Sequence, residues 1–290
     1  MKKTNLIIFT LIILLCALGV SIYLQNNPNR DYQVQDIQPA RPAEPIKKPI
    51  IHYPVPKPAV KQLEQLEQPV LPPEQNDLKA QSEALPLPEI LPPIQESDQS
   101  IQEVLQSLLS EKTIYQLLYT KNFIQKFVAT IDSLPEKRLA RALLPIKAPG
   151  GKFLVAGTPK APQISRRNYK RYIPYLTLIE SINQNLAIKF YTHFYPLFQT
   201  AYEQLGYKNA YFNDRLVYVI DHLLETPNPT DPLQLAQPVI LYTYADPTLE
   251  SLSAGQKILL RIGQNQRTRV LKILKSYRNY LTKFPPRTTE

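Results

Sequence analysis

The sequence predicts a mainly α-helical domain of about seven or eight helices over residues 98–290. A single N-terminal transmembrane helix (1–24) and a Pro-rich disordered linker (25–97) precede it. Three observations predict this organisation: an uncharged run near the N-terminus, about half of the 29 Pro in the linker, and helical spacing of apolar residues only beyond it. With one Cys, the chain is neither a disulfide scaffold nor a Cys-based zinc protein.

The uncharged run extends from Leu6 to Leu24, which as an α-helix spans about 28 Å, close to the roughly 30 Å of a bilayer's hydrocarbon core. Lys2 and Lys3 precede the run, so the positive-inside rule predicts a cytoplasmic N-terminus. A cleaved signal peptide is the alternative, because residues 17–19 resemble a small-x-small cleavage site. The run exceeds the usual apolar core of such a peptide. We therefore expect an uncleaved single-pass inner-membrane anchor, with the C-terminal domain in the periplasm.

The linker, residues 25–97, is about one-fifth Pro, which prevents sustained helix and central strand. Such a segment favours solvated polyproline II, and as a flexible coil it would average about 50 Å from end to end. Two uses stay open, a plain spacer or a Pro-rich ligand for a partner's groove. His52 lies in this linker and is set aside as a catalytic candidate.

Helical spacing begins at Asp98, where apolar residues start to recur three and four positions apart. Ser100 and Glu103 match a capping box, so we expect the first helix of the domain to begin there. A second apolar stripe over residues 123–131 predicts another helix.

Ser133 and Glu136 match a second capping box, which predicts a short helix that ends at Leu144, before Pro145. Residues 145–165 then combine several Pro and Gly with a short apolar run. This composition predicts a loop that carries one short strand or a hairpin.

The long apolar pattern over residues 166–205 predicts helix, with a break expected at residues 183–185. Gly206 follows its end as a left-handed cap. Asn213 is the expected N-cap of the next helix, which should extend to Glu225.

Asp246-Pro247 predicts another helix start, because Asp caps and Pro is tolerated in the first turn. Gly263 should separate the last two helices, the second of which runs from about Asn265 to Lys283. Strand-like alternation outside the expected hairpin is confined to residues 239–244.

The basic charge of the chain belongs to the domain, because residues 98–290 hold 25 Lys and Arg against 14 Asp and Glu. Much of it gathers near residue 166 and on the last helix, where Val270, Leu274, Tyr277 and Leu281 form the expected buried stripe. The candidate basic surface comprises Arg166, Arg167, Lys170, Arg171, Arg267, Arg269, Lys272, Lys275 and Arg278.

This charge has two interpretations, ordinary solvated helix faces or a surface for an anionic polymer or for membrane headgroups. A domain outside the cytoplasm rarely meets nucleic acid, so we expect none as a partner. The expected partners are the inner membrane and an anionic envelope component, namely peptidoglycan, lipid or lipopolysaccharide, or else an envelope protein.

The His residues of the domain show no metal or triad spacing, because His193 and His222 fall on different predicted helices. The chain also lacks a Gly motif for phosphate or dinucleotide binding. We therefore expect neither a metal nor a cofactor.

One pair of residues suggests an enzyme. Glu180-Ser181 resembles the Glu-Ser pair of lytic transglycosylases, in which one Glu of raised pKa protonates the glycosidic oxygen. A cell-wall hydrolase that uses Glu180 or Glu203 is therefore the alternative to a binding or scaffold protein, which we favour.

Three motifs follow one another in the domain: FYPLFQTAYEQLGY (194–207), YFNDRLVYVIDHLLETP (211–227) and LSAGQKILLRIG (252–263). Together they resemble a proteobacterial family of membrane-anchored proteins with a domain of unknown function, over roughly residues 100–283. The resemblance implies an N-terminal anchor and brings no established activity.

The resemblance directs attention to the polar residues inside these motifs. Helix capping explains Asn213 and Asp246, and the helix dipole explains Asp214. Four others have no such explanation, and they form a candidate polar cluster, either structural or ligand-binding. This cluster comprises Arg215, Asp221, His222 and Gln256.

Overall fold

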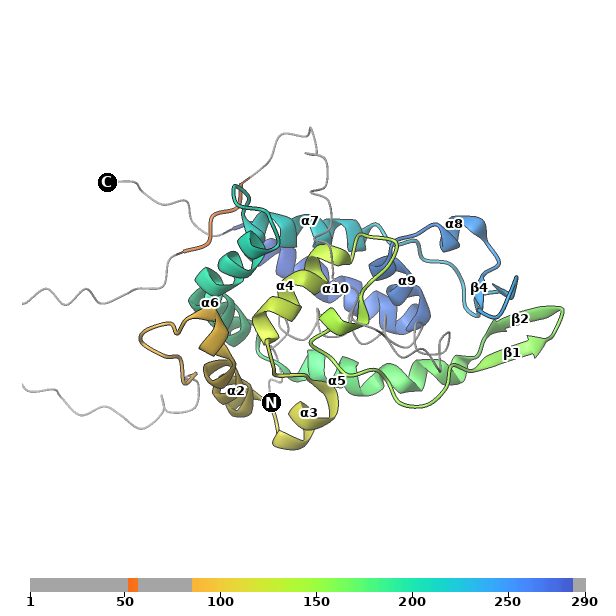
Figure 1. Ribbon diagram of the computed structural model, residues 1–290. Coiled ribbons are helices and arrows are strands. Elements are labelled where there is room, and N and C mark those ends of the chain that lie inside the picture. The colour runs from red at the N-terminus through yellow and green to blue at the C-terminus, as the bar shows by residue number, and fades with distance from the viewer. Residues whose placement is uncertain (1–51, 57–84, 284–290) are drawn as a thin grey trace, which may run out of the picture.

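The computed structural model describes residues 52–56 and 85–283, and this part of the chain is mainly helical, as expected (Figure 1). Its nine α-helices are α2 (Ser97–Leu108), α3 (Glu111–Leu117), α4 (Phe123–Ser133), α5 (Ile173–Ser181), α6 (Gln184–Gln204), α7 (Phe212–Leu224), α8 (Pro247–Glu250), α9 (Ala254–Arg261) and α10 (Gln264–Leu281). Three 3₁₀ helices accompany them: η1 (Ile94–Glu96), η2 (Arg141–Leu143) and η3 (Arg166–Tyr172).

The predicted transmembrane helix and most of the predicted linker lie outside the described residues. None of the helices that the structure does describe combines the length and the apolar character needed to cross a membrane.

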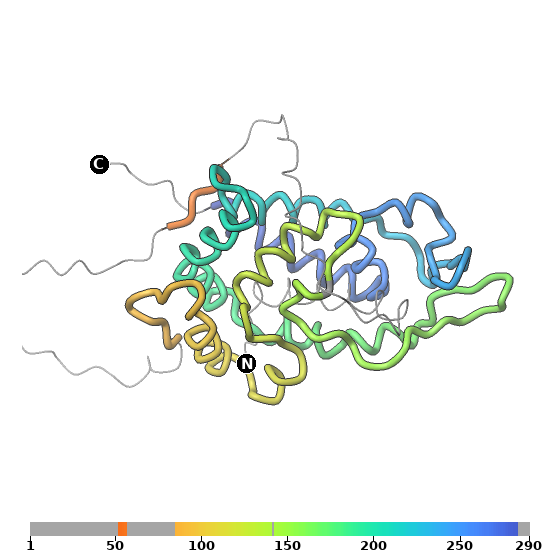
Figure 2. The backbone as a smooth tube through the Cα atoms, in the orientation of Figure 1, coloured from red at the N-terminus to blue at the C-terminus, as the bar shows by residue number. Residues whose placement is uncertain are grey.

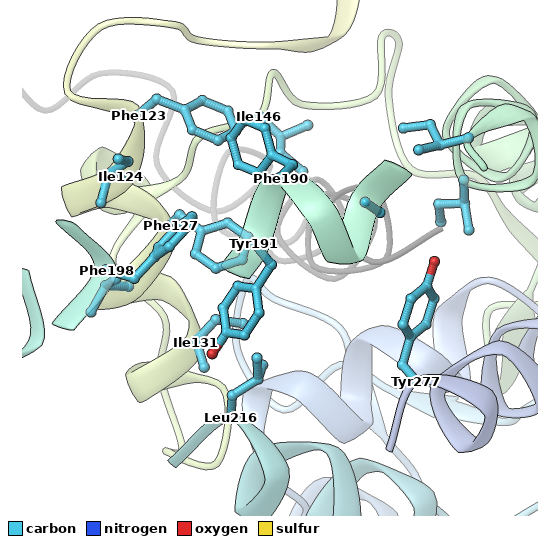
Figure 3. Packing of buried hydrophobic residues seen from close by; sticks show 14 of the residues in the cluster. Phe123, Ile124, Phe127, Ile131, Ile146, Phe190, Tyr191, Phe198, Leu216 and Tyr277 are labelled. Carbon is cyan, nitrogen blue, oxygen red and sulfur yellow. The ribbon is translucent and has the colours of Figure 1, made fainter. Parts of the chain in front are cut away.

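The centre of the domain is aromatic and lies among α4, α6, α7 and α10. Helix α4 packs on α6 and α7, and α7 packs along α10. The ring of Phe127 lies beside that of Phe198 (Figure 3), with ring centres 5.2 Å apart. Its centre is 6.3 Å from that of the Phe212 ring. All three rings are fully buried, so the apolar stripes predicted for these helices form one core.

Helix α2 does not begin with the predicted capping box. It starts at Ser97, directly after η1, and Ser100 lies inside it. The carboxylate of Asp98 instead accepts the backbone N–H groups of Asn122 and Phe123, at 2.7 and 3.1 Å. Asp98 therefore caps α4, a helix further along the chain, and this long-range contact replaces the local box.

The short helix predicted from Ser133 to Leu144 is also wrong. Ser133 is the last residue of α4, and its hydroxyl donates to the carbonyl of Ala129. The segment that follows meets the start of α9, where the N–H groups of Ala254 and Gly255 donate to the carbonyls of Glu136 and Leu134. These carbonyls accept hydrogen bonds from N–H groups in the first turn of α9, which have no partner within their own helix. Between the end of α4 and Leu144, the only helical element is η2.

The hairpin expected within residues 145–165 is present. Strands β1 (Val155–Thr158) and β2 (Ala161–Ile164) pair antiparallel and project from the end of the molecule opposite α6 (Figure 1). A second, smaller pair of strands consists of β3 (Leu235–Ala236) and β4 (Thr243–Tyr244). Of the strand-like stretch predicted at residues 239–244, only the last two residues form a strand. A separate small core lies under these strands, formed by Ile164, Leu233, Leu235, Tyr244, Leu249 and Leu260.

Most of the predicted helix boundaries in the second half are confirmed. Asn183 caps α6 by accepting two backbone N–H groups, and Gly206 ends that helix with a φ of 107°. Asp246 caps α8 through the N–H of Thr248. Asn213 is not an N-cap. Helix α7 begins at Phe212, so Asn213 lies inside it, and the Asn213 side chain is fully buried.

Gly263, between α9 and α10, combines a φ of 87° with a ψ of 157°, a conformation essentially restricted to Gly. A Cβ here would also lie 2.8 Å from ring atoms of Tyr169. We expect Gly263→Ala to lower the free energy of unfolding by about 2–3 kcal/mol, measured by urea denaturation.

Gly206→Ala is the matched control, because Gly206 also has a positive φ but a Cβ there would meet nothing within 4 Å. It should lose only about 1 kcal/mol. Equal losses for the two variants would contradict a close approach of Tyr169 to the α9–α10 turn.

Candidate functional site

Helix α7 lies at the centre of the four predicted polar residues. Arg215 joins it to α4, because its Nε donates to Asp132 Oδ1 at 2.8 Å and its Nη2 donates to the Asp132 carbonyl at 2.7 Å. Asp221 joins it to α10 through an ion pair in which both carboxylate oxygens accept from Arg278. The two side chains therefore bind different neighbouring helices.

His222 and Gln256 join α7 to α9. His222 Nε2 lies 2.9 Å from the Ser253 hydroxyl, and Gln256 Nε2 donates to the His222 carbonyl at 3.1 Å. Gln256 and Ser253 also form the capping box of α9. His222 and Gln256 are the two of the four predicted residues that hydrogen-bond to each other. The contacts of all four favour the structural interpretation of the cluster.

The Ser253–His222 pair resembles part of a nucleophile–base arrangement, but its geometry does not fit catalysis. The Ser253 hydroxyl is buried and accepts the N–H of Gln256 as the helix cap. A catalytic serine must instead present its oxygen to a substrate. The hydroxyl therefore serves the start of α9, and the contact with His222 fixes α9 against α7.

Burial lowers the pKa of His222 below its ordinary value of 6.5, and Arg215 lowers it further, whereas Glu225 and Glu136 oppose the shift. Because the folded pKa is lower than the unfolded one, the unfolded chain takes up the proton first as pH falls. The free energy of unfolding therefore keeps its full value above about pH 6.5, and it declines as the pH falls toward the pKa of His222 in the folded protein.

We therefore expect the free energy of unfolding to fall between pH 7.5 and pH 5.5, and to fall less in His222→Gln. Urea denaturation at both pH values measures this. His193, whose pKa burial also lowers, is a matched second site, and the double variant should show the shallowest dependence. An unchanged slope in the double variant would contradict the assignment.

The candidate basic surface is only partly a surface. Three of the expected residues near residue 166 and three on α10 are exposed. Arg278 is engaged by Asp221, and the Arg171 guanidinium donates to the carbonyls of Pro149, Gly150 and Gly151. The exposed members are Arg166, Arg167, Lys170, Arg269, Lys272 and Lys275.

The placement of Arg267 on this surface is wrong, because its side chain is fully buried. Its Nη2 donates to Asn228 Oδ1 at 2.7 Å and to the Pro229 carbonyl at 3.0 Å. Burial lowers the pKa of Arg267, and the charge of Asp231 opposes that shift. Arg267 therefore anchors the loop between α7 and β3 to α10.

The two carboxylates of the hydrolase alternative are exposed. Glu180 forms an ion pair with Arg269, and Glu203 accepts a hydrogen bond from Gln199 Nε2 at 2.9 Å. A glycosidase acid must be enclosed so that its proton is retained at neutral pH. Neither carboxylate has such an enclosure, so neither supports the hydrolase alternative.

Sequence reasoning missed the residues at the start of α7 that hold part of the chain's own predicted linker. The carboxylate of Asp214 binds both His52 and Tyr53, and Asn213 binds the Tyr53 carbonyl. From the sequence alone, helix-end effects account for both residues, and His52 has no predicted role. The available signal was the sequence His52–Pro56, in which His52 and Tyr53 precede Pro54 and the aliphatic Val55 lies between Pro54 and Pro56.

In residues 52–56 and 85–283, no three His, Cys, Asp or Glu side chains gather in a way that could hold a metal ion. Fold and contacts together define a mainly helical domain whose polar residues hold its helices and the segment His52–Pro56 in place. The chain belongs to the family described as Protein of unknown function (DUF3014), whose model matches residues 123–278. This confirms the expected domain of unknown function. No curated protein and no solved structure matches the chain.

The matched region has clear structural limits. It begins at the first residue of α4 and ends at Arg278, the α10 residue that pairs with Asp221. The family unit therefore contains the aromatic core and the contacts of Arg215, Asp221, His222 and Gln256. Helices α2 and α3 and the segment His52–Pro56 lie outside it.

Proposed function

We propose that this protein is a single-pass inner-membrane protein that presents its helical domain in the periplasm as a binding or scaffold module. The domain binds an anionic envelope component through exposed cations of η3 and α10. One observation carries the proposal: among the described residues, no carboxylate lies within 4 Å of the charged ends of Arg166, Arg167, Lys170, Lys272 or Lys275. These cations are therefore available to an external anion.

The two basic segments belong to neighbouring elements. Gly263, at the start of α10, faces the ring of Tyr169 in η3, and Arg269 pairs with Glu180 at the end of α5. Further along, Gln184 Nε2 donates to the Ser276 hydroxyl at 3.1 Å. Helix α10 thus runs beside η3, α5 and the start of α6, which brings the two groups of cations onto adjacent parts of the domain.

The membrane part of the proposal comes from the uncharged run Leu6–Leu24 and the preceding Lys pair. A topology reporter fused after Glu290 tests it in cells. Periplasmic activity of the reporter supports the proposed orientation, and cytoplasmic activity would rule it out.

Charge reversal on α10 tests the binding part. We expect the double variant Lys272→Glu/Lys275→Glu of the full chain to bind its anionic target at least about tenfold more weakly, because each Lys near such a surface contributes about 1 kcal/mol. Co-sedimentation with purified peptidoglycan, anionic lipid vesicles and lipopolysaccharide measures this and separates the three targets.

The matched control is Lys112→Glu/Lys121→Glu, which makes the same change of net charge at two exposed Lys in or near α3. It should retain most of the binding. An equal loss in both double variants would show that only net charge matters, and would contradict a surface on α10.

A further inference from the structure

We infer that the start of α7 and the end of α10 form a binding site for an extended, Pro-containing peptide, and that the chain's own segment His52–Pro56 occupies it. The segment lies beside the turn that precedes α7 (Figure 2, orange). This inference concerns a second surface, separate from the cations of η3 and α10, and does not depend on the membrane anchor.

The site recognises the backbone of the segment. Asp214 Oδ1 accepts the Tyr53 N–H at 2.7 Å, and Asn213 Nδ2 donates to the Tyr53 carbonyl at 2.9 Å. Both main-chain polar groups of one residue are thus satisfied by side chains of α7, as the edge of a sheet would satisfy an added strand. Any extended peptide could present these two groups.

Side chains supply the selectivity. His52 Nδ1 lies 2.9 Å from Asp214 Oδ2, and the centre of its ring is 3.9 Å from that of Tyr211. Val55 is only 8% exposed and belongs to the main hydrophobic core. The Pro on each side of Val55 fix φ, so less conformational entropy is lost on binding. The ligand class is therefore a peptide in which His and an aromatic residue are followed by Pro, an aliphatic residue and a second Pro.

Contacts that do not involve the segment also hold the receptor side in place. Asn213 is fully buried, and its Oδ1 accepts the hydroxyl of Tyr191 at 3.0 Å. Its Nδ2 also donates to the Leu281 carbonyl at 3.3 Å. Helices α6 and α10 therefore hold the Asn213 amide with its donor toward the segment.

We treat the segment His52–Pro56 as a ligand because it lies outside the family unit, whose residues bind it. Tyr211, Asn213 and Asp214 lie inside the family match, whereas His52–Pro56 lies outside it. Residues 57–84 separate the segment from the rest of the described chain, and a tethered ligand gains an effective concentration of about millimolar order. We therefore assign occupancy to the same chain, with a peptide of the same chemistry as its competitor.

Hydrogen exchange in the full chain tests the inference. Pro54 and Pro56 carry no amide, so a fragment covering residues 52–56 reports only His52, Tyr53 and Val55. We expect the Tyr53 amide to exchange at least about tenfold more slowly than a solvated one. Asp214→Ala should remove this protection, whereas Asp246→Ala, which removes an Asp from the start of α8, should keep it.

Competition decides whether the site is exchangeable. An excess of a synthetic peptide with the sequence of residues 50–58 should accelerate exchange at Tyr53, and the same peptide with Val55→Asp should not. Unprotected Tyr53 in the wild-type chain, or protection unchanged at saturating peptide, would overturn the inference. Protection that rises with protein concentration would overturn occupancy by the same chain and assign the segment to a second copy.

Discussion

Replacing Arg267 with Ala is expected to lower the free energy of unfolding by about 3–5 kcal/mol, the range for truncating a large buried side chain to Ala. The guanidinium is fully buried, so the variant leaves a cavity in place of a side chain that fills the space beside α10. It also removes the donors that satisfy Asn228 Oδ1 and the Pro229 carbonyl. Urea denaturation monitored by circular dichroism measures the loss.

The chain offers a matched control two residues away on the same helix. Arg269 is 53% exposed and pairs with Glu180 at the surface. Because exposed ion pairs contribute about 1 kcal/mol or less, Arg269→Ala should have a small effect. A similar loss of unfolding free energy in both variants would contradict the burial of Arg267 and would instead support its predicted place on the basic surface.

Phe127→Ala is the second variant expected to have a large effect, with a loss of about 3–5 kcal/mol in the free energy of unfolding. The Phe127 ring contacts rings from both α6 and α7, so its removal opens a cavity where three helices meet. The surrounding rings of Phe198 and Phe212 stack on each other with centres 5.9 Å apart, which limits how far they can collapse into the space.

Tyr115→Ala is the corresponding control, because Tyr115 is an aromatic residue that is 77% exposed. Its ring contacts only the flexible end of Lys147 among the described cations, so its loss should stay below about 1 kcal/mol. A loss below about 1 kcal/mol for Phe127→Ala would mean that the aromatic core is not packed as the structure shows.

Helix boundaries set by local chemistry could be predicted from the sequence, and those set by distant contacts could not. Asn183, Gly206 and Asp246 act within their own turn, and each was predicted correctly. Asp98 caps a helix 24 residues away, and the carbonyls after α4 serve α9, so local capping rules gave the wrong helices there. Nothing in a short window of sequence specifies such partners.

The burial of Arg267 could have been predicted from helical spacing, but its charge favoured a surface position. Counting back three residues from Val270 along the buried stripe of α10 reaches Arg267, so helical spacing alone places it inside. Asn213 has the same relation to Leu216 on α7 and is also buried. In both cases the polar residue type outweighed the periodicity, although a buried polar group needs only hydrogen-bond partners.

The candidate polar cluster could be located on α7 but not assembled from the sequence. His222 lies seven positions after Arg215, which places the two on the same side of the helix, whereas Asp221 lies about 100° from His222. Because α7 packs against α4, α9 and α10, these directions meet different partners: Asp132, Ser253 and Arg278. The identity of each partner depends on the tertiary fold.

The dependence of binding on ionic strength tests most directly whether the domain acts through its exposed cations. The measurement is co-sedimentation of the full chain with purified peptidoglycan, anionic vesicles and lipopolysaccharide at about 0.1 M and about 1 M salt, with binding to neutral vesicles subtracted as the contribution of the predicted anchor. Between these salt concentrations the screening length falls from about 10 to about 3 Å. We expect binding to at least one target at low salt and its loss at high salt. Binding that persists unchanged at high salt, or no binding to any target at low salt, would contradict the proposed function.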